Sequence, residues 1–152
     1  MNTPSPADDA FHKLVALAGE VAGGASDAEI EAAEAKLGLV FPQKYRDFLR
    51  SYGAALLPGA EIFGLVDVTR NDPPLWTDVR KVTEQLRSRG QAGTEDGRFL
   101  PISEDGTGVY FYLNTAIAPG VEIWAVGPSV RQLIGNDLYV FASDLASGQI
   151  AL

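Results

Sequence analysis

The first third of the chain alternates helical stripes of apolar residues with short polar stops. Ser26 stands three residues before Glu29, a spacing that predicts a capping box and the start of a helix. Gly38 is suited to the left-handed conformation that ends a helix, Pro42 restarts the chain at a first helical position, and Gly53 closes this second helix. The positions expected to face the core are Ile30, Ala33 and Leu37 in the first helix, and Tyr45, Phe48, Leu49 and Tyr52 in the second.

Patterns farther along predict strands joined by tight turns, with helices before and after them. Strands are expected over residues 61–66, in a hairpin over 99–113, and over 121–126 and 130–134. Further helices are expected near 11–18, from Asp72-Pro73-Pro74 to Gly90, and after a cap at Asn136 or Asp137, ending at Gly148. Because short hairpin links leave no room for crossover helices, the sequence predicts an α+β fold with a mainly antiparallel sheet flanked by short helices.

Length and punctuation indicate one domain. A chain of 152 residues fits a single hydrophobic core, and no repeat or linker divides it. Residues 1–10 are rich in proline and small polar residues, so we expect a flexible lead-in there and a single domain over 11–152. The same opening residues lack the pattern of a secretory leader, and the apolar stretch 14–18 is too short to span a bilayer.

Net charge limits the classes of partner, and cysteine content limits the chemistry and the expected compartment. The net charge of −8 disfavours direct binding to nucleic acid or to an anionic membrane. The negative charge favours solubility. An alternative interpretation is electrostatic complementarity to a basic protein partner. The chain has no cysteine, so disulfides and thiolate chemistry are excluded and the cytoplasm is the expected compartment.

Candidate catalytic and metal-binding groups are sparse. His12 is the only histidine, so neither a zinc site built on imidazoles nor a Ser-His-Asp relay is expected, and we predict no metal and no cofactor. Glu104 and Asp105 precede the glycines Gly106 and Gly108, but the alternating oxygens of a calcium loop are missing. A hairpin turn explains this segment, and an enzyme acting through Glu104 or Asp105 is the less favoured alternative because neither carboxylate has an evident partner.

The basic residues of the chain include one local group. Its members are Arg80, Lys81, Arg87, Arg89 and Arg98. Five acids lie among them over residues 71–100, and the bases do not form one continuous helical stripe. A solvated helix face therefore explains the group better than a phosphate-binding site does.

Aromatic and acidic residues alternate along two predicted strands. Tyr110 and Tyr112 lie on one face of their strand, opposite Phe111, and Glu122 and Trp124 can occupy the same face of the next strand. If helices cover only the other face of the sheet, these residues form a recognition surface together with Glu104 and Asp105. If both faces are covered, the rings belong to the core.

The helical and strand segments resemble the SUKH superfamily, which includes fungal cell-wall assembly regulators and bacterial immunity proteins. The resemblance covers roughly residues 24–147. It rests on the motifs Asp27-Ala28-Glu29-Ile30, Leu37-Gly38, Phe41-Pro42, Phe48-Leu49, Tyr52-Gly53, Ile62-Phe63-Gly64, Phe99-Leu100-Pro101-Ile102 and Glu104-Asp105-Gly106-Thr107-Gly108. Where family members often carry Asn-Gly-Gly after the second helix, this chain has Gly53-Ala54-Ala55.

The resemblance implies a non-catalytic protein that works by binding other proteins. One implied function is that of an immunity protein, which neutralises the cognate toxin of a bacterial polymorphic toxin system. The negative charge is compatible with a basic nuclease domain as that toxin. The alternative is a regulatory or scaffold module like the eukaryotic members, which carry long disordered extensions, whereas this chain has only a short lead-in.

Overall fold

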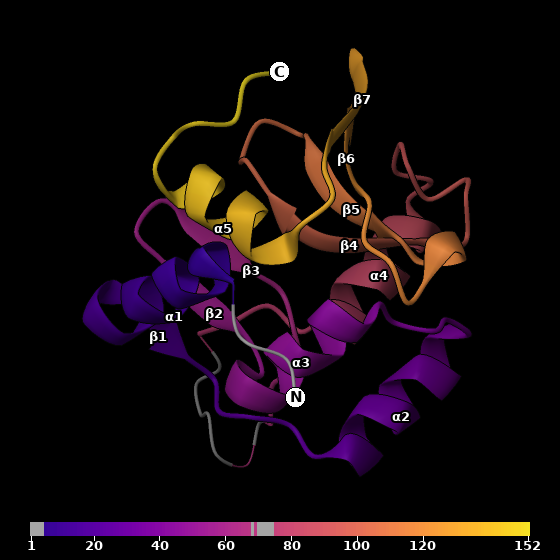
Figure 1. Cartoon of the computed structure of the whole chain (residues 1–152). Coiled ribbons are helices and arrows are strands. Elements are labelled where there is room, and N and C mark those ends of the chain that lie inside the picture. Colours follow the sequence, from indigo (N-terminus) through magenta and orange to yellow (C-terminus); the bar gives the residue numbers. More distant parts are fainter. Residues whose placement is uncertain (1–4, 68, 70–74) are drawn as a thin grey trace.

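The computed structural model describes residues 5–67, 69 and 75–152. Helices and antiparallel strands make up an α+β fold in this part of the chain, as the sequence predicted (Figure 1). In chain order the elements are α1 (Pro6–Ala18), β1 (Glu20–Val21), α2 (Asp27–Leu37), α3 (Gln43–Tyr52), β2 (Ala55–Leu57), β3 (Ala60–Ile62), α4 (Val79–Ser88), β4 (Phe99–Glu104), β5 (Tyr110–Asn114), the 3-10 helix η1 (Thr115–Ile117), β6 (Ile123–Gly127), β7 (Val130–Gly135) and α5 (Leu138–Ala146).

The strands form two antiparallel sheets. A small sheet has the order β1-β2-β3, and a larger one has the order β4-β5-β6-β7. The predicted hairpin over 99–113 and the predicted strands near 121–126 and 130–134 are confirmed as the four strands of the larger sheet. Hydrogen bonds connect the two sheets, since the Phe63 amide donates to the Ile102 carbonyl at 2.8 Å and the Ser103 hydroxyl donates to the Glu61 carbonyl at 2.6 Å.

The predicted stop and start signals of the first helices are present. The Ser26 hydroxyl accepts from the Glu29 amide, and the Glu29 carboxylate accepts from the Ser26 amide, both at 3.1 Å. Gly38 ends α2 with φ 70°, in the left-handed region, and Gly53 ends α3 with φ 74°. Pro42 differs slightly from the prediction because it is the N-cap of α3 and not its first helical residue.

Three boundaries differ from the sequence prediction. Helix α1 begins at Pro6, capped by Ser5, so the helix takes in half of the segment expected to be a lead-in. The strand expected over 61–66 ends at Ile62, because the backbone beyond it hydrogen-bonds to α3 and to the start of α4: the Leu65 amide donates to Gly53 and the Val79 amide to Gly64. Helix α4 begins after an Asp78 cap, and the predicted opening at residues 72–74 lies outside the described residues.

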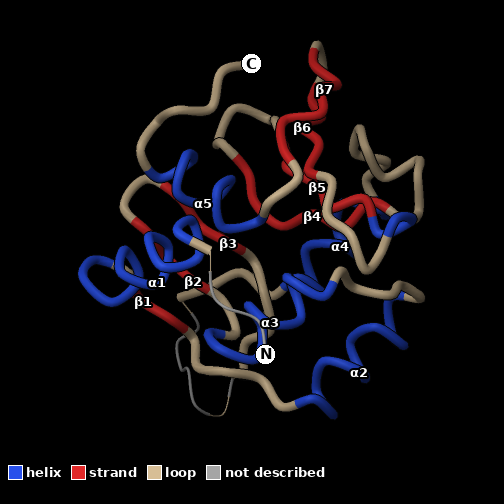
Figure 2. The backbone as a smooth tube through the Cα atoms, viewed as in Figure 1, coloured by secondary structure: helices blue, strands red, loops and turns tan. Residues whose placement is uncertain are grey.

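The core lies between the helices and one face of the larger sheet, here called the inner face (Figure 2). The Phe141 ring of α5 packs against Phe111 of β5 with centroids 5.1 Å apart. The Phe11 ring of α1 stacks on Tyr139 of α5 at 4.4 Å. Helix α5 therefore packs on the inner face of the larger sheet, and α1 packs in turn on α5 and on β2 of the small sheet. In the described part of the chain, no helix has the length and apolar character needed to cross a membrane.

Candidate functional site

The face of the larger sheet that points away from the core is here called the outer sheet face. Cross-strand register arranges its residues in three rows. The rows are Phe99, Asn114 and Glu122; then Pro101, Tyr112, Trp124 and Leu133; then Glu104, Tyr110, Val126 and Arg131. The alternation of side chains along β5 and β6 thus brings Glu104, Tyr110, Tyr112, Glu122 and Trp124 to one face.

Asp105 lies apart from these five predicted residues, in the turn between β4 and β5. Its carboxylate accepts from the Thr107 amide at 2.8 Å and from the Thr107 hydroxyl at 2.7 Å. Gly106 and Gly108 both have positive φ there, of 82° and 97°. The segment is therefore a hairpin turn, in which Asp105 serves as a local hydrogen-bond acceptor.

Tyr112 is covered, unlike its neighbours in the predicted surface. Its side chain is 0% exposed, and its hydroxyl donates to the Ala92 carbonyl at 2.9 Å. The loop over residues 91–98, here called the covering loop, lies over this part of the sheet, where Phe99, Tyr112 and Val126 form a small cluster apart from the main core. A Cβ on Gly93 would lie 2.5 Å from the Tyr112 ring, so glycine permits this close approach. The Tyr112 ring is therefore buried and does not form part of an exposed surface.

Arg131 holds the covering loop, and the sequence analysis missed it. Its guanidinium donates to Glu95 at 2.6 Å and lies over the Phe99 ring, 5.4 Å from the centroid. The second oxygen of Glu95 accepts from the Gly93 amide at 2.7 Å. Hydrogen bonds from its own amide and from Arg131 lower the pKa of Glu95. The predicted strands over 121–126 and 130–134 could have indicated this position, because their antiparallel pairing puts Arg131 opposite Val126 on the outer sheet face.

Glu122 and Trp124 form a fixed acidic and aromatic pair. The indole nitrogen of Trp124 donates to Oε1 of Glu122 at 3.1 Å, and the Asn114 amide donates to the same oxygen at 3.1 Å. These two bonds lower the pKa of Glu122, in the order given. Both side chains are half-buried, so the pair presents an oriented indole beside a carboxylate. Such a pair suits a cationic side chain, which can lie on the ring and bind the carboxylate.

Tyr110 borders this pair on the same face. It is half-buried opposite Glu104, and burial first and the neighbouring Glu104 carboxylate second raise the pKa of its hydroxyl, while Arg89 opposes them. Leu133, which pairs with Trp124 across the sheet, is 49% exposed. The open part of the outer sheet face therefore combines two aromatic rings, an exposed aliphatic side chain and two acids, a composition typical of protein interfaces.

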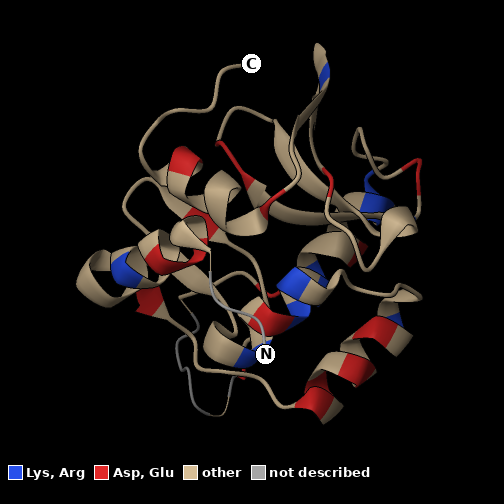
Figure 3. Cartoon of the chain, in the orientation of Figure 1, with Lys and Arg blue, Asp and Glu red and all other residues tan. Residues whose placement is uncertain are grey.

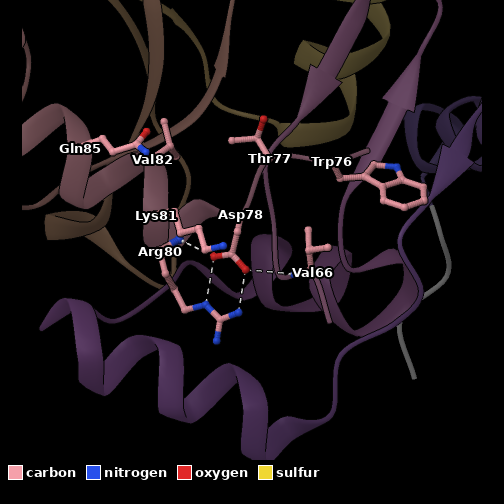
Figure 4. Close-up of a pocket in the computed structure, with 8 residues that line it drawn as sticks. All are labelled: Val66, Trp76, Thr77, Asp78, Arg80, Lys81, Val82 and Gln85. Carbon is pink, nitrogen blue, oxygen red and sulfur yellow. Dashed lines mark hydrogen bonds and ion pairs between the residues drawn. The ribbon is translucent and has the colours of Figure 1, made fainter. Parts of the chain in front are cut away.

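A pocket of about 450 Å³ opens beside the N-terminus of α4 (Figure 4). It is lined by Val66, Trp76, Thr77, Asp78, Arg80, Lys81, Val82 and Gln85. Asp78 and Arg80 form a two-point ion pair in it, with Nε to Oδ1 at 3.0 Å and Nη2 to Oδ2 at 2.6 Å. Burial alone would raise the pKa of Asp78, but the hydrogen bonds and charge of Arg80 outweigh it and lower that pKa. Arg80 thus neutralises Asp78, which is the most buried charged side chain of the pocket.

Residues of the local basic group bind separate partners within the chain. Arg80 binds Asp78, Arg87 donates to the Gly97 carbonyl at 3.0 Å, and Arg98 lies 3.3 Å from Asp96. Figure 3 shows acidic residues along α2 next to basic ones on α3, where Arg50 binds Asp27 at 2.8 Å. These pairings favour the interpretation of the basic group as solvated and internally neutralised surface.

Within residues 5–67, 69 and 75–152, no group of three or more histidine, aspartate or glutamate side chains could hold a metal ion. His12 instead packs between aromatic residues, with its Nδ1 hydrogen-bonded to the Tyr52 hydroxyl. The fold and the outer sheet face define a small α+β domain that presents a mixed aromatic and acidic surface.

Comparison with protein families identifies the family of this domain. Residues 27–145 match the family described as SMI1-KNR4 cell-wall, SUKH_6. The match covers most of the chain, and the chain belongs to this family of the SUKH superfamily. No curated protein matches the chain in sequence.

Proposed function

We propose that this chain is an immunity protein, which binds the cognate toxin of a bacterial polymorphic toxin system and neutralises it in the cytoplasm. Membership of the SUKH superfamily supports a protein that acts on a protein partner. The observation that carries the proposal is the open part of the outer sheet face, where Glu122 orients Trp124 on the same face as Tyr110. This proposal assigns no catalytic step and no cofactor to the chain.

Inhibition then follows from stoichiometric binding that blocks or distorts the toxin's active site. A stable interface of this kind buries about 800 Å² on each partner, and a few central aromatic side chains supply most of the binding free energy. Trp124 and Tyr110 are the proposed anchors, with Glu104, Glu122 and Asp105 at their margins. Tyr112, which is buried, lies on the same face opposite Trp124 and next to Tyr110.

The charge of the chain supports a basic toxin. With a net charge of −8, the protein attracts a positively charged domain, and a nuclease toxin is basic where it holds nucleic acid. The carboxylates of Glu104 and Glu122 supply acceptors for lysine or arginine side chains beside the aromatic anchors. We therefore expect association to be faster at low ionic strength than at high ionic strength.

The test is co-expression with the toxin domain encoded in the neighbouring reading frame. The wild-type chain should restore growth and form a 1:1 complex in gel filtration. Trp124→Ala should weaken binding by about 30-fold, the amount expected for a central aromatic anchor worth about 2 kcal/mol. Glu122→Lys should weaken binding similarly, whereas Glu31→Lys, the same charge change on an exposed position of α2, should not.

Two results would contradict the proposal. No rescue and no complex would exclude neutralisation of that toxin. A tight complex without rescue would favour the regulatory or scaffold alternative. A third result, rescue that is insensitive to both Trp124→Ala and Glu122→Lys, would leave neutralisation standing and remove the outer sheet face as its site.

A further inference from the structure

The larger sheet ends in an uncovered edge at β7. This strand pairs with β6 alone, and residues 130–135 make no backbone hydrogen bond outside that ladder within the described chain (Figure 1). Pro128-Ser129 forms the turn between Gly127 and Val130, which are the first paired residues. The alternating ladder therefore directs the amide and carbonyl groups of Arg131 and Leu133 away from β6.

Natural proteins usually protect such an edge with charged side chains, prolines or a very short strand. β7 has six residues and contains no proline. Its one charge belongs to Arg131, whose guanidinium turns over the sheet to Glu95 and to the Phe99 ring. The edge is therefore left open along its length, and Leu133 beside it is 49% exposed.

A groove of about 270 Å³ continues from the end of β7 to helix α5. Ile134, Phe141 and Ile150 supply apolar surface, and Val140 at the groove is 42% exposed. Asp144 lies in the same groove, and its carboxylate has no ion pair or hydrogen bond with the described residues. The groove thus offers an apolar floor with a carboxylate that no internal cation neutralises.

We propose that β7 accepts an extended segment of another protein, which adds a fifth strand to the sheet. An added strand lies about 4.8 Å from β7, so its inward side chains next to Ile134 would enter the groove. The segment that fits carries an apolar residue for the groove and a lysine or arginine for Asp144. A second copy of this chain fits less well, because both copies carry a net charge of −8 and repel each other. The inference does not depend on the proposed toxin.

A synthetic peptide tests the proposal on the isolated protein. The probe is a blocked heptapeptide of alternating valine and threonine with one lysine near its end. When it binds, amide exchange at Arg131 and Leu133 should slow at least tenfold, while exchange at Glu29 stays unchanged. The same peptide with N-methyl groups on its pairing edge keeps every side chain but loses the backbone donors, and should bind at least tenfold more weakly.

Two variants test the groove. Asp144→Lys and Val140→Ser should each weaken binding of the lysine probe at least fivefold, the first through charge and the second through loss of apolar surface, and Glu31→Lys is the matched control for charge. Glutamate in place of lysine in the probe should weaken binding to the wild type and restore it to Asp144→Lys. Three results would overturn the proposal: equal binding of the N-methylated probe, no slowing of exchange at β7, or self-association of the chain through β7 in sedimentation.

Discussion

The hydroxyl of Tyr45 donates a hydrogen bond of 2.7 Å to the carbonyl of Phe63. Both residues are buried, and the bond joins the first turn of α3 to the segment that follows β3. Tyr45→Phe removes the donor and leaves a buried carbonyl without its partner. We expect the free energy of unfolding to fall by about 1–3 kcal/mol, measured by urea denaturation.

Tyr110→Phe is the matched control for this prediction, since Tyr110 is half-buried at the surface. It should change the free energy of unfolding by less than about 0.5 kcal/mol. Equal stability of Tyr45→Phe and the wild type would show that the bond between α3 and Phe63 contributes nothing net.

Asp78 makes the stability of the fold sensitive to acid. Its side chain is 8% exposed, and Arg80 holds its pKa below the ordinary value of 3.8 despite burial. The folded state therefore binds the proton less tightly than the unfolded state, so the stabilisation is complete above pH 3.8 and is lost as pH falls through the folded pKa. Asp78→Asn keeps a capping oxygen but removes the charge, and should cost about 2 kcal/mol at pH 7.

The measurement is the free energy of unfolding of both proteins from pH 7 to pH 3. The difference between wild type and Asp78→Asn should shrink as the pH falls, because the wild-type carboxylate becomes protonated. Glu31→Gln, which removes a carboxylate at an exposed position of α2, is the control for the loss of one negative charge. A difference for Asp78→Asn that does not vary with pH would contradict the assignment.

Alanine substitutions at Gly53 and Gly38 distinguish the free-energy cost of a positive φ from the cost of steric crowding. Their φ values are 74° and 70°, but a Cβ on Gly53 would lie 2.2 Å from the Gly23 carbonyl oxygen, and a Cβ on Gly38 would meet nothing within 4 Å. Gly38→Ala should therefore cost about 1–2 kcal/mol, the strain of the left-handed conformation. Gly53→Ala should be far more destabilising, visible as loss of the cooperative thermal transition, and similar melting temperatures would contradict this.

The Tyr112 hydroxyl fixes the covering loop. Tyr112→Phe removes its bond to Ala92 without changing the ring, so the fold should lose only about 1 kcal/mol. Amide exchange at Gly93 and Thr94 should become faster by about tenfold or less, the factor that corresponds to that free energy. Exchange at Glu29 in the capping box of α2 is the internal control. Unchanged exchange in the loop would show that Arg131 and Glu95 hold it without Tyr112.

Much of the fold could be predicted because its signals are local. The Ser26 and Glu29 box, the end of α2 at Gly38 and the Asp137 cap of α5 each involve residues within four positions of one another. The contact of Gly53 with Gly64 is different, because it joins segments with no periodic relationship. Strands β1 and β2 of the small sheet were missed for a similar reason, since they have two and three residues and no alternation to reveal them.

The candidate site was predicted only in part. Alternation of side chains along a strand placed Tyr110, Tyr112, Glu122 and Trp124 on one face, and the register of β5 with β6 brings them together. Which of them is covered depends on where the loop after α4 folds back, and hydrophobic periodicity does not encode that. Tyr112 is therefore buried beneath Ala92 and Gly93, whereas Trp124 is left half-buried at the surface.

The covering loop contributes no side chain to the main hydrophobic core. Substitutions of its exposed residues can alter the charge that borders Trp124 and Tyr110 while the interior stays intact, provided that the Ala92 carbonyl and Gly93 keep their positions. If the proposed function holds, the choice of partner can thus be altered through changes in a short segment, at little cost to folding.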